Sequence, residues 1–300
     1  MRTVAFVGLG VMGRPMAGHL AKAGFDVKTY DIKAKGNCAS LREAASGAHF
    51  LVTMLPDGKA VRRVVLASLP HLAKNALVVD TSSSDPEDIR GLSKKIDLVD
   101  APVSGAVVGA RAASLTFMVG GTKENFRRAR PLLAAMGKQI FHVGPVGAGD
   151  VVKALNNYLG AVGTLAGFEA LLIARAFRLD PLPMLAAINA STGRNSTTAV
   201  KIARDILPRA YASGFKLALM AKDVAIARRL AAEAGVHAPF LRTTLAMWRR
   251  AQAALPRAAD HSEIYKYQAA LARGAGAPAR RRASSRPRRA RRKSVPGSRG

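Results

Sequence analysis

Cysteine is almost absent from this chain, and its absence excludes several kinds of site. Cys38 is the only cysteine, so the chain can form neither an intrachain disulfide nor a zinc site built from cysteines. The 6 histidines show no spacing typical of metal ligands, and we expect no metal. Because disulfides accumulate in oxidising compartments, a single cysteine favours a reducing one, with the cytoplasm as the default.

Long hydrophobic runs are also missing. No uninterrupted apolar stretch reaches the roughly 18–20 residues that a membrane-spanning helix needs. Residues 1–10 carry one arginine and run directly into glycines, which is typical of a first strand rather than of a signal peptide. We therefore expect no membrane contact. Hydrophobic residues still make up 49% of the 300 residues, enough for the core of one large domain or two ordinary ones.

Acidic residues are scarce. The chain has 19 Asp and Glu against 47 Lys and Arg, which gives a formal net charge of +28. Residues 274–300 hold ten of the basic residues and no acidic one, so about +18 remains on the rest. A basic surface raises the local concentration of an anionic cofactor and an anionic substrate. It could equally give loose affinity for nucleic acid.

Short apolar runs alternate with helical patterns over the first half of the chain. Apolar runs of strand length predict strands at 3–7, 27–30, 50–55, 77–80, 97–101 and 116–119. Helices are predicted at 14–23, 58–69, 86–95 and 123–136. This alternation indicates a parallel sheet, so we expect a doubly wound α/β domain over 1–150.

The pattern changes after Gly149. Helices are predicted at 150–177, 181–190, 197–206, 217–234 and 239–254, and no run among them is typical of a strand. We therefore expect an all-α domain over 151–273, which begins with a long helix that joins it to the sheet. Residues 274–300 are rich in Arg, Ala, Ser, Pro and Gly and cannot bury enough apolar surface to fold. We expect them to form a disordered Arg-rich tail.

A glycine-rich turn separates the first predicted strand from the first predicted helix. In that context G-x-G-x-x-G predicts dinucleotide binding. Gly8 permits the tight turn, Gly10 lets the backbone approach a pyrophosphate, and Gly13 lets the helix pack closely on the strand. The first N–H groups of the helix then face the phosphates. The predicted cofactor-binding residues of this turn are Gly8, Leu9, Gly10, Val11, Met12 and Gly13.

The residue that selects between NAD and NADP is predicted to be Asp31, which ends the second strand 18 positions after Gly13. An acid there can accept hydrogen bonds from both ribose hydroxyls of NAD and repels the 2′-phosphate of NADP. Lys28, Lys33 and Lys35 stand nearby and could hold a 2′-phosphate instead. The acid favours NAD, and NADP stays open as the alternative.

From about residue 3 to about residue 272 the sequence resembles the β-hydroxyacid dehydrogenase family, close to its 3-hydroxyisobutyrate dehydrogenase branch. The motifs are G-L-G-V-M-G-R-P-M-A at 8–17, M-L-P at 54–56, D-A-P-V-S-G at 100–105, G-A-G-D-V-V-K-A-L-N-N at 147–157, S-T-G-R at 191–194 and M-A-K-D at 220–223. The resemblance implies a Rossmann domain, then an all-α domain, with the active site between them. It also implies a homo-oligomeric enzyme that moves a hydride between NAD or NADP and a small 3-hydroxy acid or its semialdehyde.

The resemblance also implies a role for individual residues. Lys153 would be the catalytic acid/base, because hydride leaves a carbinol carbon only if the hydroxyl proton is removed. Asn157 lies one helical turn further on the same face and would hold the same oxygen or orient the amine. The substrate carboxylate would bind at Ser104, Gly105 and Ala106. The other predicted cofactor contacts are Leu55 and Pro56 near the ribose, Ser83 near the nicotinamide, and Lys222 from the helical domain.

Some positions depart from the usual family pattern, and some roles have a plainer alternative. His19 stands where Asn is common, and Ala106 and Ala113 stand where glycines are common. These departures bear on the substrate more than on the reaction. Lys222 and Asp223 could form a surface pair worth little free energy.

Two rival functions remain open. Tartronate, succinic and glyoxylic semialdehyde reductases share the lysine, and NADPH specificity would favour them. A protein of another class would use its basic tail on nucleic acid, through R-R-R at 280–282 and R-R-A-R-R-K at 288–293. Residues 280–293 contain no aromatic side chain that could stack on bases, so such binding would be nonspecific.

Overall fold

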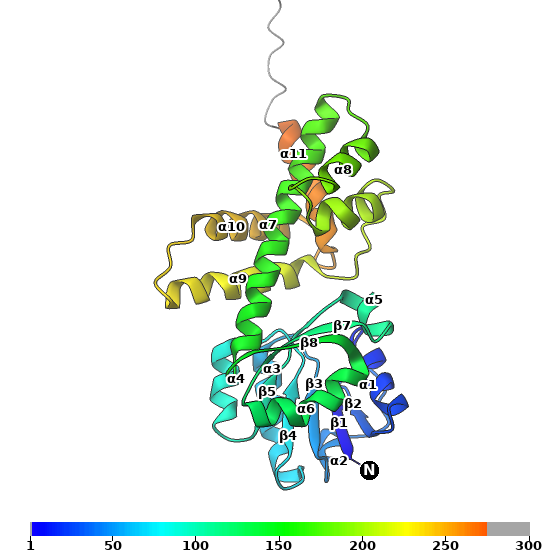
Figure 1. Ribbon diagram of the computed structural model, residues 1–300, viewed down its shortest axis with the longest axis vertical. Helices are drawn as coiled ribbons and strands as arrows, with labels where there is room; N and C mark the ends of the chain where they lie inside the picture. Colours follow the sequence, from blue (N-terminus) through cyan, green and yellow to red (C-terminus); the bar gives the residue numbers. More distant parts are fainter. Residues whose placement is uncertain (1, 275–300) are drawn as a thin grey trace, which may run out of the picture.

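The computed structural model describes residues 2–274, which fold into a sheet domain followed by a helical domain (Figure 1). The predicted disordered tail, including 280–293, lies outside the described residues apart from Gly274. The expected fold class, an N-terminal Rossmann-like domain followed by an all-α domain, is confirmed.

One sheet holds every strand of the described residues. The strands are β1 (Thr3–Val7), β2 (Asp26–Tyr30), β3 (Phe50–Thr53), β4 (Leu77–Asp80), β5 (Leu98–Asp100), β6 (Val103–Ser104), β7 (Leu115–Gly120) and β8 (Gly137–Gly144). Their order is β2-β1-β3-β4-β5-β7-β6, with β8 beside β7. Strands β1 to β5 pair in parallel, whereas β7 is antiparallel to β5 and β6 and parallel to β8. The order reverses between β1 and β3, which is where doubly wound sheets bind ligands.

Helices cover both faces of this sheet. They are α1 (Gly13–Lys22), α2 (Leu41–Ala45), α3 (Gly58–Ser68), the 3₁₀ turn η1 (Leu69–His71), α4 (Pro86–Ser93), α5 (Ala106–Arg111) and α6 (Lys123–Met136). One apolar cluster packs Phe6 and Phe117 of the sheet against Leu20 of α1. A second packs the other face against Val61 of α3 and Ile89 of α4. Burial on both faces explains why β3 and β4 are almost uninterrupted apolar runs.

The second domain is built from helices. They are α7 (Ala148–Ala176), α8 (Pro181–Asn189), the π-helix η2 (Thr197–Ile206), α9 (Leu217–Glu233), α10 (Pro239–Ala254), the 3₁₀ turn η3 (His261–Glu263) and α11 (Ile264–Gly274). Figure 1 shows α7 rising from the sheet domain through the helical domain, with α9 and α10 as a hairpin that crosses it. Trp248 of α10 and Phe168 of α7 are fully buried in the helical core.

Helix α7 is the one helix of the described residues that is long and apolar enough to cross a membrane, judged by length and composition alone. Core helices of soluble proteins share this length and composition. Here α7 contributes Ala161, Phe168 and Leu171 to the helical core.

The predicted strands and helices are present within a few residues of their expected ends. The elements that were not predicted were missed for physical reasons. The patterns gave no sign of β6, α2 and α5, which are too short to show a period. Strand β8 lies largely exposed, so its side chains do not alternate between apolar and polar. Residues 197–206 were predicted as an α-helix and form a π-helix instead.

Candidate active site

The turn after β1 has the geometry that a dinucleotide needs. Gly8 has a φ of +103°, and a Cβ there would lie 2.2 Å from the carbonyl oxygen of Met54. A Cβ on Gly13 would lie 1.9 Å from the carbonyl oxygen of Gly8, so α1 can approach β1 only with glycine. A Cβ on Gly10 would meet nothing within 4 Å. The backbone at Gly10 therefore faces open space, as phosphate binding requires.

Asp31 is fixed against this turn by backbone donors. Its Oδ2 accepts a hydrogen bond from the Leu9 N–H at 2.7 Å, and its Oδ1 accepts from Lys33 N–H at 2.7 Å and Ala34 N–H at 3.0 Å. Partial burial raises the pKa of Asp31, but these N–H groups outweigh it and hold the pKa below its ordinary value. Lys28 is turned elsewhere, since its Nζ donates to the carbonyl of Ser46 at 2.8 Å.

Lys222 of α9 joins the helical domain to the sheet domain across the space between them, which we call the cleft. Its Nζ donates to the carbonyl of Ser83 at 2.6 Å and to that of Pro56 at 3.2 Å. Both carbonyls belong to loops at the carboxyl ends of parallel strands, β4 and β3. The structure therefore brings together three of the residues predicted from sequence. Leu55 lies beside them, and its N–H donates to the Ser82 hydroxyl at 2.9 Å.

Lys153 and Asn157 of α7 face the start of α9. The Asn157 Nδ2 donates to Asp223 Oδ2 at 2.6 Å, and Lys222 Nζ lies 3.2 Å from Asp223 Oδ1. Asp223 is buried, so the Lys222–Asp223 pair is part of the cleft rather than a surface pair. Burial and the Lys222 charge lower the pKa of Lys153, while Asp223 and Asp150 raise it, and the balance is a lowered pKa.

The start of α7 is anchored by a buried carboxylate of the sheet. Asp100, at the end of β5, accepts from Gly147 N–H at 2.7 Å and from Asp150 N–H at 2.9 Å. Asp150 is itself buried, and its Oδ1 accepts from Ser84 N–H at 2.9 Å. Burial raises the pKa of both carboxyls. Asp100 thus fixes where α7 begins and, one turn later, the place of Lys153.

The predicted substrate loop follows β6. Ser104 is half-buried and Gly105 and Ala106 are exposed at the start of α5. His19 of α1 fastens the far end of α5, since its Nε2 lies 3.0 Å from the carbonyl oxygen of Arg111. From the helical domain, a loop approaches α5, where a Cβ on Gly214 would lie 3.4 Å from Val107 Cγ2. No hydrogen bond in the described part of the chain joins the substrate loop to Lys153.

Ala106 in the substrate loop and Ala113 just after α5 both have a backbone conformation that favours glycine. Ala106 has a φ of +53° and Ala113 a φ of +50°. Left-handed backbone costs an L-residue about 1–2 kcal/mol, although glycine loses more entropy on folding. We expect Ala113→Gly to raise the free energy of unfolding by about 0.5–1 kcal/mol. Urea denaturation measures this, and Ala110→Gly, inside α5, is the matched control that should destabilise. A loss of stability in Ala113→Gly would contradict the strain.

The S-T-G-R motif forms no hydrogen bond with Lys153, Asn157, Lys222 or Asp223 in the described part of the chain. Residues 191–194 form an exposed turn after α8, and the Ser191 hydroxyl donates back to the Ala187 carbonyl at 2.8 Å. Residues 2–274 hold no group of three His, Cys, Asp or Glu that could bind a metal ion. Sequence reasoning gave no site role to Asp100, Asp150 or Asp223, although all three lie inside the quoted motifs.

Comparisons with known proteins agree with this geometry. The family model for the NAD-binding domain of 6-phosphogluconate dehydrogenase matches residues 3–144. The model described as NAD-binding of NADP-dependent 3-hydroxyisobutyrate dehydrogenase matches residues 147–268. The two matches meet at the start of α7, where Asp100 holds the helix to the sheet.

Individual relatives cover most of the chain. An NAD-dependent L-serine dehydrogenase of Pseudomonas aeruginosa is 36% identical over 83% of this chain and 92% of its own length. A 3-hydroxyisobutyrate dehydrogenase of the same organism is 38% identical over 76% of this chain and 84% of its own. The solved 3-hydroxyisobutyrate dehydrogenase of Mycobacterium tuberculosis with L-serine is 32% identical, with a TM-score of 0.81 over 89% of this chain and 99% of that one. Together with the glycine turn and the cleft, these matches establish that the chain belongs to the β-hydroxyacid dehydrogenase family, as an NAD(P)-dependent enzyme acting on hydroxy acids.

Proposed function

We propose that Lys153 is the acid/base with which this enzyme interconverts a small 3-hydroxy acid and its semialdehyde. The observation that carries the proposal is the cluster on α7 and α9. There the Asn157–Asp223 hydrogen bond joins the two helices beside Lys153, and Lys222 of α9 pairs with the same Asp223 carboxylate. Lys153 makes no hydrogen bond or ion pair within residues 2–274, so its amine is left for a substrate.

The neutral amine of Lys153 would accept the hydroxyl proton during oxidation, and the ammonium would return it during reduction. A bound nicotinamide supplies the hydride acceptor or donor. A lowered pKa suits both directions, because it brings the neutral and charged amines closer to equal population. Asn157 would hold the reacting oxygen or keep the amine in place. Lys222, tied to Ser83 and Pro56, would keep the domains closed over the cofactor.

The cofactor should be NAD rather than NADP, because Asp31 presents a fixed negative charge beside the turn. Wild type should bind NADH more tightly than NADPH, and Asp31→Ala should reduce the ratio of affinities about tenfold. Fluorescence titration with both reduced cofactors measures this. Asp26→Ala, at the opposite end of β2, is the control and should leave the ratio unchanged. Equal affinity of the wild type for both cofactors would mean that nearby basic residues decide instead.

The substrate carboxylate should bind at the turn formed by Ser104, Gly105 and Ala106. The Ser104 hydroxyl and the backbone N–H groups are suitable donors to an anion. A methyl ester lacks the charge and leaves these donors poorly paired, at about 1–3 kcal/mol per buried group. We therefore expect kcat/KM for the methyl ester to fall about tenfold to a hundredfold below that for the free acid. An enzyme that turned over both equally would remove this role from the turn.

The experiment that tests the proposed function is turnover with NAD on a panel of 3-hydroxy acids, with the Lys153→Ala variant as its control. The panel would include 3-hydroxyisobutyrate and L-serine, which the names of relatives specify. Substrates of the semialdehyde reductases, tested with NADPH, would cover the second candidate. Leu159 of α7 and Phe177, which follows the helix, are 68% and 75% exposed, which supports a homo-oligomer.

A further inference from the structure

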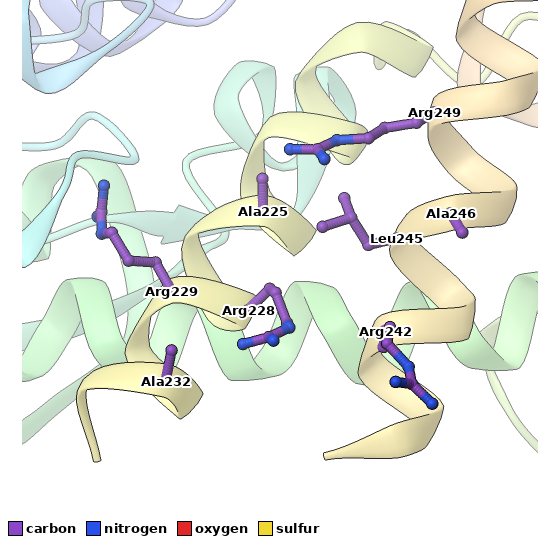
Figure 2. Close-up of a pocket in the computed structure, with 8 residues that line it drawn as sticks. All are labelled: Ala225, Arg228, Arg229, Ala232, Arg242, Leu245, Ala246 and Arg249. Atoms are coloured by element: carbon purple, nitrogen blue, oxygen red, sulfur yellow. The ribbon is translucent and has the colours of Figure 1, made fainter. Parts of the chain in front are cut away.

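A groove of about 470 Å³ lies between α9 and α10, away from the glycine turn. Figure 2 shows its lining, in which Arg249 reaches across from α10 towards α9, and Arg228 and Arg242 stand on the two helices at the same level of the groove. The other lining residues are Ala225, Arg229, Ala232, Leu245 and Ala246. The groove therefore has an apolar floor and an arginine rim.

Neither acid of this hairpin pairs with Arg228, Arg242 or Arg249. Residues 217–254 contain six basic side chains and only two acidic ones, Asp223 and Glu233. Asp223 is held by Asn157 and Lys222 in the active-site cleft. Glu233 pairs with Arg229 at 3.2 Å, and Arg229 also pairs with Asp85 of the sheet domain.

Three arginines of the rim are thus left without an acid. Arg228, Arg242 and Arg249 form no ion pair within the part of the chain that the structure describes. Like charges gathered around one hollow repel one another, and a bound anion would relieve the repulsion. Guanidinium groups recognise phosphate and carboxylate through paired hydrogen bonds. A hollow of this size is within the range of small-ligand sites.

We propose that this groove binds a small multivalent oxyanion, a phosphate chain or a tricarboxylate, at a site separate from substrate and cofactor. Arg228, Arg242 and Arg249 would supply its charged donors, and Leu245 and Ala225 its floor. A neighbouring hollow of about 500 Å³ includes Arg249, Lys222 and Ser83, so the groove opens towards the active-site cleft. The two hollows share Ala225, Arg229 and Arg249, whereas Arg228 and Arg242 line the groove alone.

The experiment measures the labelling rate of each arginine separately, because the basic tail of the full chain would also attract anions. Phenylglyoxal labelling of the full chain, read by peptide mass spectrometry, is compared with and without triphosphate and citrate at constant ionic strength and saturating NAD. Labelling of Arg228, Arg242 and Arg249 should slow roughly tenfold at saturating anion. Arg250, next in sequence on α10 but outside the groove, is the internal control and should keep its rate.

Variants then test the site itself. Arg242→Ala and Arg249→Ala should each lower the affinity for the anion about tenfold, as measured by the anion concentration that protects Arg228. Arg250→Ala should change this affinity less than about twofold. Protection by triphosphate alone or by citrate alone supports the proposal and names the chemistry of the anion. Equal protection of Arg250 would reveal a diffuse ion atmosphere and overturn it. Protection that is seen without NAD but is lost at saturating NAD would overturn it too. The arginines would then belong to the cofactor region.

Discussion

Replacing Asp100 with alanine is expected to lower the free energy of unfolding by about 2–5 kcal/mol. The substitution leaves the N–H groups of Gly147 and Asp150 without their acceptor in a buried site. A buried donor without a partner costs about 1–3 kcal/mol. Urea denaturation followed by circular dichroism measures the loss.

Two matched variants separate the hydrogen bonds from the loss of an acid. Asp100→Asn keeps one acceptor oxygen, so we expect about half of the loss seen with alanine. Asp97 precedes β5, and its half-exposed side chain pairs with Arg128. Asp97→Ala should therefore cost under about 1 kcal/mol. Equal losses for Asp97→Ala and Asp100→Ala would show that Asp100 does not anchor α7.

The turn after β1 could be predicted from sequence because its chemistry is local. Gly8, Gly10 and Gly13 serve a strand, a turn and a helix that are consecutive in the chain, and the structure gives each the surroundings that the spacing implies. Asp31 follows from the same unit, since β2 lies beside β1. The same argument explains the sheet: runs buried on both faces are visible without any tertiary information.

Residues whose role depends on distant partners could not be predicted in this way. Asp223 is separated from Asn157 by 66 positions. From the sequence alone, the simpler interpretation of Asp223 was a surface ion pair with Lys222. Asp100 is separated from Asp150 by 50 positions, and nothing local indicates that it receives the first turn of α7. The arginine groove needs α9 and α10 to fold against each other before its four arginines meet. A buried acid such as Asp100, whose partners are backbone N–H groups far along the chain, leaves no pattern in the sequence.

Lys153→Ala is expected to lower kcat by about 10²–10⁴, the usual contribution of a positioned acid/base. Lys153→Arg should be nearly as slow, because a guanidinium does not release its proton at working pH. NADH affinity should change little in either variant, because the glycine turn and Asp31 belong to the sheet domain, whereas Lys153 stands on α7. Steady-state rates and NADH titration measure the two effects separately. A variant that lost NADH binding together with its rate would mark Lys153 as a cofactor or structural residue.

The pH dependence of kcat/KM, compared between wild type and Lys153→Ala, tests proton transfer by Lys153 most directly. Oxidation needs the neutral amine, so the wild-type rate should rise with pH and level off above a pKa that is lower than the roughly 10.4 of a free lysine. Reduction needs the ammonium, so its rate should fall through the same pKa. Burial and the charge of Lys222 are the physical causes of the lowered pKa. Both inflections should vanish in Lys153→Ala, and an unchanged inflection in that variant would contradict the role of Lys153.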